Sequence, residues 1–261
     1  MDSRIQQSVV ASLSARPAAT EIGPFVLGLD PGTDSPHANY ATPRPGAAVT
    51  GADVTRMVAA FRDAGRRPRL EYVTTCAPEL EALLTAAGFE VEARHEYLVC
   101  SARTLTTPDV PDGFELRQPV SDEDVAALIS AQNEAFGGEP VASPADVDRL
   151  RRRQAEGGVA VLAVSAGDVA PGPDGQGRGA CVGGGQAVPP RDAVSEVTGI
   201  AVRRPYRRRG LAGAITAAVT ARLFAADVGV AWLEASGEES WRVYERVGYR
   251  PAGRRLYLRL P

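Results

Sequence analysis

An arginine-rich turn followed by small residues is the segment of the sequence best suited to chemistry. Five arginines lie within residues 203–209, and Gly210 and Gly213 follow them at the start of an apolar segment with helical spacing. The first N–H groups of a helix have no partner within the helix and lie at the positive end of its dipole. Because glycine has no side chain, a bulky anion can approach these N–H groups closely. The segment therefore predicts a cradle for a phosphate or diphosphate group.

The composition excludes several other classes of phosphate chemistry. All 29 basic residues are arginines, so the chain has no lysine for a Schiff base with pyridoxal phosphate and no P-loop lysine. Residues 210–213 read Gly-Leu-Ala-Gly and do not match the GxGxxG fingerprint of dinucleotide-binding folds. Nucleic acid could bind such an arginine cluster, but a sequence pI of about 5.6 argues against it.

The remaining reactive side chains do not indicate covalent catalysis, metal binding or disulfides. The two histidines, His37 and His95, both precede residue 100, and the three cysteines, Cys76, Cys100 and Cys181, form no CxxC pair. A serine or cysteine nucleophile in the second half of the chain would need a histidine from the first half. We therefore expect reduced thiols, no metal site and no covalent enzyme intermediate.

Charge is distributed unevenly along the chain, whose net charge is −3. Residues 108–200 hold 7 arginines against 15 acidic residues, whereas residues 201–261 hold 12 arginines against 5 acidic residues. The basic end of the chain suits an anionic ligand, and the acidic middle suits a cationic one. The imbalance suggests a local anion site and a cationic co-substrate.

The arginine-rich turn needs a strand before it and a helix after it to hold it in place. The apolar and alternating patterns predict three strands and two helices in this part of the chain. They are the strands Val194–Val202, Val230–Ala235 and Tyr249–Leu260 and the helices Leu211–Ala226 and Glu238–Val247. Because helices alternate with strands, the pattern predicts an α/β fold.

A similar alternation precedes these elements. Ser121 with Asp124, and Ser143 with Asp146, have the spacing of capping boxes and predict the starts of two helices. Strands are predicted at Phe114–Arg117, Val159–Ser165 and Ala180–Val188. Residues 167–179 are rich in glycine and proline and are predicted to form a flexible loop.

A linker and a weak repeat indicate two halves. The two prolines and the terminal glycine of Thr106–Gly113 predict a domain boundary, with domains at 1–107 and 114–261. The dipeptides Leu70-Glu71, Gly88-Phe89 and Tyr97-Leu98 have counterparts in Leu233-Glu234, Gly248-Tyr249 and Tyr257-Leu258. The first half has no counterpart of the arginine-glycine turn, so we expect only the second half to bind the anion.

Two motifs in the second half carry a family resemblance. Arg207–Ala212 matches the signature Q/R-x-x-G-x-G/A, and Tyr244–Tyr249 reads YERVGY. Together with the order of elements over 114–261, these motifs resemble the GNAT (Gcn5-related) N-acetyltransferase superfamily, and the first half resembles a degenerate copy, as in tandem acetyltransferases. The resemblance implies an α/β fold with a central mixed, mostly antiparallel sheet, splayed central strands and helices on both faces, in two tandem copies.

The resemblance also implies roles for individual residues. The backbone amides of the turn would hold the diphosphate of acetyl-CoA, and the main chain of the preceding strand would hydrogen-bond the pantetheine arm. The implied coenzyme-binding residues are Ile200, Ala201, Val202, Arg207, Arg208, Arg209, Gly210, Leu211, Ala212 and Gly213. Tyr244 would be the general acid that protonates the departing CoA thiolate, because a phenol with a pKa of about 10 is protonated at neutral pH.

A base must take a proton from the acceptor amine, directly or through water. Glu196 is the first candidate, because members of the family often place a glutamate on this strand ahead of the signature. In a regular strand, its side chain would share a face with those of Thr198, Ile200 and Val202. Glu234 is the second candidate.

One departure from the family pattern lies before the final helix. Many relatives have an asparagine seven residues before the tyrosine, and Gly237 occupies that position here. Ser236 could hold a water molecule. Any role of the asparagine side chain in ordering the site is either missing here or taken over by Ser236 or Ser240.

The implied activity is transfer of the acetyl group of acetyl-CoA to a primary amine of a small molecule, by direct attack in a ternary complex. The alternative is a catalytically inactive module that binds acyl-CoA or regulates another protein. The first half would help to form the acceptor wall. Because the sequence has no signal peptide and no membrane-spanning run, we expect a cytoplasmic monomer or homodimer with no nucleic-acid or membrane partner.

Overall fold

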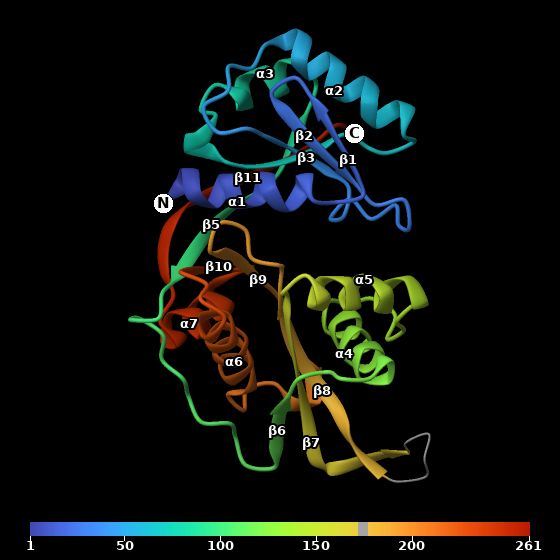
Figure 1. Ribbon diagram of the computed structural model, residues 1–261, viewed down its shortest axis with the longest axis vertical. Helices are drawn as coiled ribbons and strands as arrows, with labels where there is room; N and C mark the ends of the chain where they lie inside the picture. The colour runs from blue at the N-terminus through green and yellow to red at the C-terminus, as the bar shows by residue number, and fades with distance from the viewer. Residues whose placement is uncertain (172–176) are drawn as a thin grey trace. The chain divides into compact units, whose positions relative to one another are not determined.

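A computed structural model describes residues 1–171 and 177–261, which form two compact units (Figure 1). The first unit contains residues 1–98 and 251–261, and the second contains residues 99–250. In the described residues, no helix is both long enough and apolar enough to cross a membrane.

The first unit contains a sheet with the strand order β1-β2-β3-β4-β11-β5. Its strands are β1 (Ala18–Ile22), β2 (Phe25–Leu29), β3 (Tyr40–Pro43), β4 (Arg69–Val73), β5 (Glu90–Cys100) and β11 (Arg250–Arg259). Its helices are α1 (Asp2–Ser14), α2 (Gly51–Asp63), the short 3-10 helix η1 (Thr74–Cys76) and α3 (Leu80–Ala86). Strands β3 and β4 pair in parallel, whereas β1 with β2, β2 with β3 and β4 with β11 pair antiparallel.

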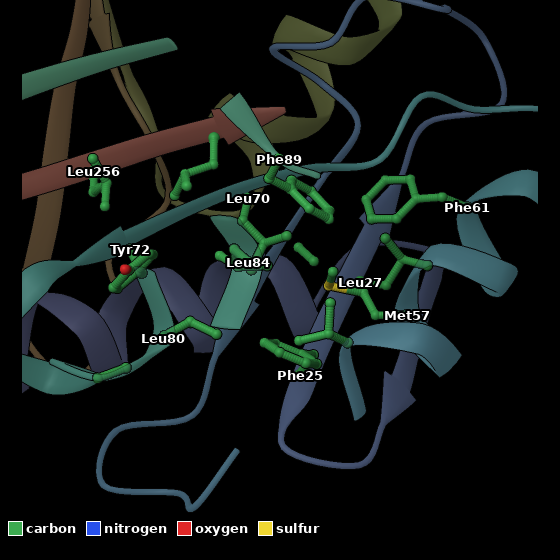
Figure 2. Close-up of a cluster of buried hydrophobic side chains, with 14 residues drawn as sticks. Phe25, Leu27, Met57, Phe61, Leu70, Tyr72, Leu80, Leu84, Phe89 and Leu256 are labelled. Carbon is green, nitrogen blue, oxygen red and sulfur yellow. The ribbon is translucent and has the colours of Figure 1, made fainter. Parts of the chain in front are cut away.

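The core of the first unit lies between its sheet and helices α2 and α3 (Figure 2). Phe25 of β2 and Met57 and Phe61 of α2 are completely buried, and they pack with Leu84 of α3 and Leu256 of β11. Helix α2 presents apolar side chains every three or four residues, which is the spacing that buries one face of a helix.

The second unit contains a sheet with the strand order β6-β7-β8-β9-β10. Its strands are β6 (Phe114–Arg117), β7 (Val159–Pro171), β8 (Gly177–Ala187), β9 (Val194–Val202) and β10 (Val230–Glu234). Its helices are α4 (Asp122–Ala135), α5 (Pro144–Ala155), the 3-10 helix η2 (Arg204–Tyr206), α6 (Leu211–Ala225) and α7 (Glu238–Val247). Only the β9–β10 pair is parallel among these described strands, so the predicted mixed, mostly antiparallel α/β fold is confirmed.

Helices cover both faces of this second sheet, as predicted (Figure 1). A Cβ atom at Gly184 of β8 would lie 2.2 Å from Leu128 of α4, whereas one at Gly185 would lie 3.0 Å from Ile215 of α6. Neighbouring glycines of one strand thus face opposite helices, because successive residues of a strand point to opposite sides. The absence of side chains here lets both helices approach the sheet closely.

Local sequence signals located most elements of the second unit. Strand β9, helix α7 and strand β6 have the predicted bounds. The hydroxyls of Ser121 and Ser143 accept hydrogen bonds from the N–H groups of Asp124 and Asp146, both at 3.2 Å. Only the second of these pairs forms a complete capping box, because the Asp124 carboxylate turns to other partners.

The predicted flexible loop at 167–179 is in large part wrong. Strands β7 and β8 extend into it, and Val169 pairs with Gly179 and Pro171 with Gly177. Residues 172–176, at the centre of the predicted loop, lie outside the described residues. The glycine and proline content predicted a loop because these residues have a weak intrinsic preference for strands. Cross-strand hydrogen bonds between β7 and β8 outweigh that preference.

The last strand of the chain belongs to the first unit. Strand β11 pairs antiparallel with β4, with Arg255 opposite Val73 and Arg259 opposite Arg69. The compact units therefore differ from the domains 1–107 and 114–261, and the duplication itself stays a prediction. Sequence patterns identify strands but do not identify the partner of a strand that is distant in the sequence.

The repeated dipeptides occupy matching elements. Leu70-Glu71 lies in β4 and Leu233-Glu234 in β10, and each strand is followed by a helix, α3 or α7. Gly88 and Gly248 end those helices with φ of +90° and +102°. The following strands, β5 and β11, carry Tyr97 and Tyr257. The two segments therefore repeat one strand–helix–strand arrangement.

Candidate active site

The predicted anion cradle lies between β9 and α6. The turn passes through η2, and Arg208 and Gly210 have positive φ angles of +65° and +87°. The N–H groups of Gly213 and Ala214 donate to the carbonyl of Gly210. Within the part of the chain that the structure describes, the N–H groups of Gly210, Leu211 and Ala212 have no hydrogen-bond acceptor. These donors point out of the helix start, where an anion is favoured.

The arginines of the turn differ in their surroundings: some contact neighbouring elements and hold the turn in place, and others are exposed to solvent. Arg207 donates to the carbonyl of Val202 at 2.9 Å and to that of Ala135 at 3.1 Å, so it ties the turn to β9 and α4. Arg209 lies over the Phe114 ring, with its guanidinium carbon 5.9 Å from the ring centroid. Arg208 keeps 84% of its side chain exposed and contacts Glu239 of α7 at 3.0 Å. The sequence pattern does not distinguish these arginines, whereas their contacts in the structure do.

Strands β9 and β10 part next to this cradle. Their parallel pairing runs from Val194 opposite Val230 to Glu196 opposite Trp232. Beyond this point, residues 197–202 of β9 pair only with β8 among the described strands. Apart from the Val202 carbonyl, which accepts from Arg207, the main-chain groups on the other edge of β9 are therefore available to a ligand, and this is the expected splay.

A bulge in β9 was not foreseen. Gly199 has a φ of +63°, and the register with β8 slips by one residue between Thr198 and Ala201. The amide of Gln132, on α4, donates to the carbonyl of Gly199 at 2.7 Å. A Cβ atom at Gly199 would lie 2.4 Å from that amide nitrogen, so a larger residue would displace the Gln132 side chain and strain the backbone. An isolated glycine within a strand pattern was the sequence signal for this bulge.

The bulge changes which face of β9 each side chain occupies. Ile200 and Val202 pack in the cluster beneath α6. Thr198 lies opposite Gln186, whose amide is 3.3 Å from an α4 side chain, so Thr198 and Glu196 face α4. The expectation that Glu196 shares a face with Ile200 and Val202 is therefore wrong, because the extra residue reverses the alternation.

Tyr244 lies on the buried side of α7, where its ring centroid is 6.3 Å from that of Tyr249. Its hydroxyl has no hydrogen-bond partner among the described residues. Burial raises the pKa of the Tyr244 phenol to about 12. By contrast, the Tyr249 hydroxyl is 2.6 Å from that of Thr220. Of these two tyrosines, only Tyr244 has an uncommitted proton to offer a ligand.

The turn before α7, where Gly237 stands, is held by a serine side chain. Ser240 Oγ donates to the carbonyl of Gly237 at 2.8 Å and accepts from its N–H at 3.2 Å. Ser236 Oγ lies 3.4 Å from Ser240 Oγ. Ser240 therefore orders this turn with its own side chain.

The alternative base Glu234 is the last residue of β10, directly before this turn.

The linker predicted as a domain boundary lies against the cradle. The N–H of Thr106 donates to the carbonyl of Val247 at 2.9 Å. Pro108 and Pro111 lie 3.9 Å and 3.6 Å from where Cβ atoms of Gly213 and Gly210 would be. Sequence reasoning identified this segment by its prolines but assigned it no place at the site.

Comparison with known proteins places these features in a family. Residues 131–249 match the family model described as "Acetyltransferase (GNAT) family". This range contains the bulge, the cradle, the parting strands and Tyr244. None of the curated proteins compared with the sequence matches it.

Several solved structures share the fold of the whole chain. A GCN5-related N-acetyltransferase from Kribbella flavida is 24% identical, with a TM-score of 0.79 over 100% of this chain and 96% of the other. One from Sphaerobacter thermophilus is 18% identical, with a TM-score of 0.62 over 91% and 80%. A tandem GNAT protein from the clavulanic acid biosynthesis pathway is 15% identical, with a TM-score of 0.62 over 94% and 84%. Residues 131–249 therefore form a GNAT acetyltransferase domain, and the solved structures share the fold of the whole chain.

Proposed function

We propose that the chain is an N-acetyltransferase that moves the acetyl group of acetyl-CoA to a primary amine of a small molecule. The observation that carries this proposal is the parting of β9 and β10 after Glu196 and Trp232, directly before a helix start with unbonded N–H groups. The first feature suits an extended amide-containing chain and the second suits a diphosphate. Acetyl-CoA has both parts in one molecule.

The donor would lie along β9 and the cradle. The diphosphate would accept hydrogen bonds from the N–H groups of Gly210, Leu211 and Ala212, and the exposed Arg208 would add attraction. The amides of the pantetheine arm would pair with the exposed edge of β9 at Ile200–Val202, in the way that a peptide adds a strand to a sheet. This residue set fits the chemistry of the coenzyme without a lysine.

Tyr244 would donate a hydrogen bond from its hydroxyl to the sulfur as it leaves. A phenol with a pKa of about 12 stays protonated throughout the neutral and mildly alkaline range. Because a thiol has a pKa of about 8.5, complete proton transfer to its thiolate is uphill, and the phenol acts chiefly as a hydrogen-bond donor. This donor stabilises negative charge on sulfur as the C–S bond breaks.

Glu196 would accept the proton of the attacking amine, directly or through water. It is the last residue of β9 that pairs with β10, so it lies where the opening between the strands begins. Its side chain faces α4, whereas Tyr244 extends from α7 beside α6. The base and the acid would thus act from opposite faces of the sheet. The acceptor would enter on the α4 face and the thiolate would leave on the other.

The amine would attack the thioester directly, and no acyl-enzyme would form. Cys181 and Cys100 have thiol pKa values raised by burial, which makes both of them poor nucleophiles. The excess of acidic residues over 108–200 favours a cationic acceptor, such as an amino acid, an aminoglycoside or a polyamine.

The test is release of CoA thiol from acetyl-CoA in the presence of a panel of small amines. Turnover with at least one amine is expected, and Glu196→Gln should reduce it while leaving CoA binding intact. If CoA binds but no amine is acetylated, the chain is instead the catalytically inactive acyl-CoA-binding module. If Glu196→Gln acetylates at the wild-type rate at every pH, Glu196 is not the base.

A further inference from the structure

A hollow on the outer side of α7 is lined mainly by arginines. Its walls are Arg242, Glu245, Arg246 and Arg250, which we call the arginine hollow, and its volume is about 350 Å³. Three guanidinium groups face one carboxylate there, so the hollow carries an excess of positive charge. A compact, multiply charged anion is the ligand that such a set of donors favours.

The guanidinium groups are held in different ways. Arg250 donates to the carbonyls of Glu245 and Tyr249, both at 2.8 Å, which fixes its position at the end of α7. Arg242 contacts Glu238, but both of these side chains are largely exposed. Within the described part of the chain, Arg246 makes no side-chain hydrogen bond or ion pair. The donors of Arg246 are therefore available to a ligand.

The helix dipole accounts for only part of this cluster. Cations are favoured near the C-terminal end of a helix, which suits Arg246 and Arg250. Arg242 lies in the middle of α7 and four residues before Arg246, a spacing at which like charges repel each other. A bound anion would offset this repulsion, because it attracts both guanidinium groups.

The arginine hollow adjoins the side of α7 that meets the cradle. Glu239 contacts Arg208 of the turn, and Val243 and Val247 each lie 3.9 Å from where a Cβ atom of Gly213 would be. Residues three apart are neighbours on a helix surface, so Arg242 lies beside Glu239 and Arg246 beside Val243. From Glu239 to Arg246 the helix rises by roughly 10 Å. A ligand whose diphosphate sits on the cradle could therefore place a second phosphate among these arginines.

We propose that the arginine hollow binds the 3′-phosphate of coenzyme A. This proposal rests on the proposed function, which places the coenzyme diphosphate on the cradle. One ribose separates the 3′-phosphate from the diphosphate, and the 3′-phosphate is a dianionic monoester with three free oxygens. Arg242 and Arg246 would bind these oxygens with charge-assisted hydrogen bonds, and Arg250 would add positive charge.

The test compares CoA with 3′-dephospho-CoA by titration calorimetry, which does not depend on turnover. We expect the wild-type protein to bind CoA roughly ten-fold or more tightly than dephospho-CoA. The double variant Arg242→Gln/Arg246→Gln should bring this ratio close to one, with the Kd for dephospho-CoA unchanged. Arg152→Gln, an exposed arginine of α5, is the matched control and should keep the wild-type ratio.

Three results would overturn the proposal: equal wild-type affinity for both coenzymes, a wild-type ratio in the double variant, or equal weakening of both coenzymes. Equal wild-type affinity would also result if the hollow held free phosphate or a phosphate of the acceptor.

If the ratio behaves as expected but no amine is acetylated, the proposed catalytic function fails and the phosphate site stands. If amines are acetylated and the coenzymes bind equally, the phosphate site fails alone. If neither coenzyme binds, both proposals fail.

Discussion

The side-chain amide of Gln132 donates a 2.7 Å hydrogen bond to the carbonyl of Gly199, at the bulge of β9. This bond connects α4 to the strand that carries both Glu196 and the edge proposed to bind acetyl-CoA. Because Gln132 is buried, little water competes with its amide for the Gly199 carbonyl. The bulge is therefore held from one side by a single side chain.

Replacing Gln132 should disturb the site more than it disturbs the fold. Gln132→Leu leaves the Gly199 carbonyl without its donor, which costs about 1–3 kcal/mol of stability if the carbonyl stays dry. We expect kcat/KM for acetyl-CoA to fall roughly ten-fold, measured by thiol release, in protein that still unfolds cooperatively. Gln186→Leu, which removes a weaker 3.3 Å contact and leaves the Gly199 bond, is the control. Equal losses in the two variants would contradict a positioning role for Gln132.

Removing the Tyr244 hydroxyl should affect catalysis but not folding. Tyr244→Phe is expected to lower kcat on the order of 10²-fold, because the departing sulfur loses its donor. Its melting temperature should stay near that of the wild type, since the hydroxyl has no hydrogen-bond partner among the described residues. Tyr249→Phe is the opposite case, because it loses the 2.6 Å contact with Thr220 and should destabilise the protein.

The pH dependence of kcat checks the same assignment. With a pKa of about 12, Tyr244 remains protonated up to about pH 10, so it should cause no loss of activity at that pH. Activity should instead rise with pH, as the acceptor amine loses its proton, and then level off. A fall in kcat near pH 9 that disappears in Tyr244→Phe would rule out this pKa.

Gly248 should tolerate no side chain. It ends α7 with a φ of +102°, and a Cβ atom there would lie 1.8 Å from the carbonyl oxygen of Thr104. We expect Gly248→Ala to destabilise the protein by several kcal/mol, because backbone strain adds to the clash. Gly237→Ala is the matched control, since its Cβ atom would meet nothing within 4 Å and its φ of 167° is extended. Chemical denaturation of both variants measures the difference, and equal midpoints would contradict it.

The ion pair at the start of α4 predicts how stability depends on pH. Both guanidinium nitrogens of Arg117 contact Asp124 at 2.6 Å, and these hydrogen bonds lower the pKa of the Asp124 carboxyl. A lowered folded-state pKa means that this stabilisation is present above the unfolded value of about 3.9 and is lost as pH falls through the folded value.

Asp124→Asn should therefore destabilise the protein by about 2 kcal/mol at pH 7, and the difference from wild type should shrink below about pH 4. Asp122→Asn, whose carboxyl is 74% exposed in its contact with Arg151, should change stability by less than about 0.5 kcal/mol. Urea denaturation at several pH values provides the measurement. A constant difference between Asp124→Asn and wild type at every pH would refute the linkage.

Local chemistry in the sequence determined many of the elements and predicted the position of the cradle. Ser121 and Ser143 begin their helices through contacts three residues away, and the bounds of β9 and α7 follow from side-chain periodicity. The arginine-glycine turn was recognisable for the same reason, because a helix start needs only its own backbone and neighbouring residues to attract an anion.

Tertiary structure alone decided how these parts meet. The bulge at Gly199 depends on Gln132, 67 residues away, and it reverses the face on which Glu196 lies. The end of the β9–β10 pairing, the linker prolines against the cradle and the pairing of β11 with β4 are also contacts between distant segments. Such contacts depend on shape and packing across the folded chain, and no local pattern of residue types records them.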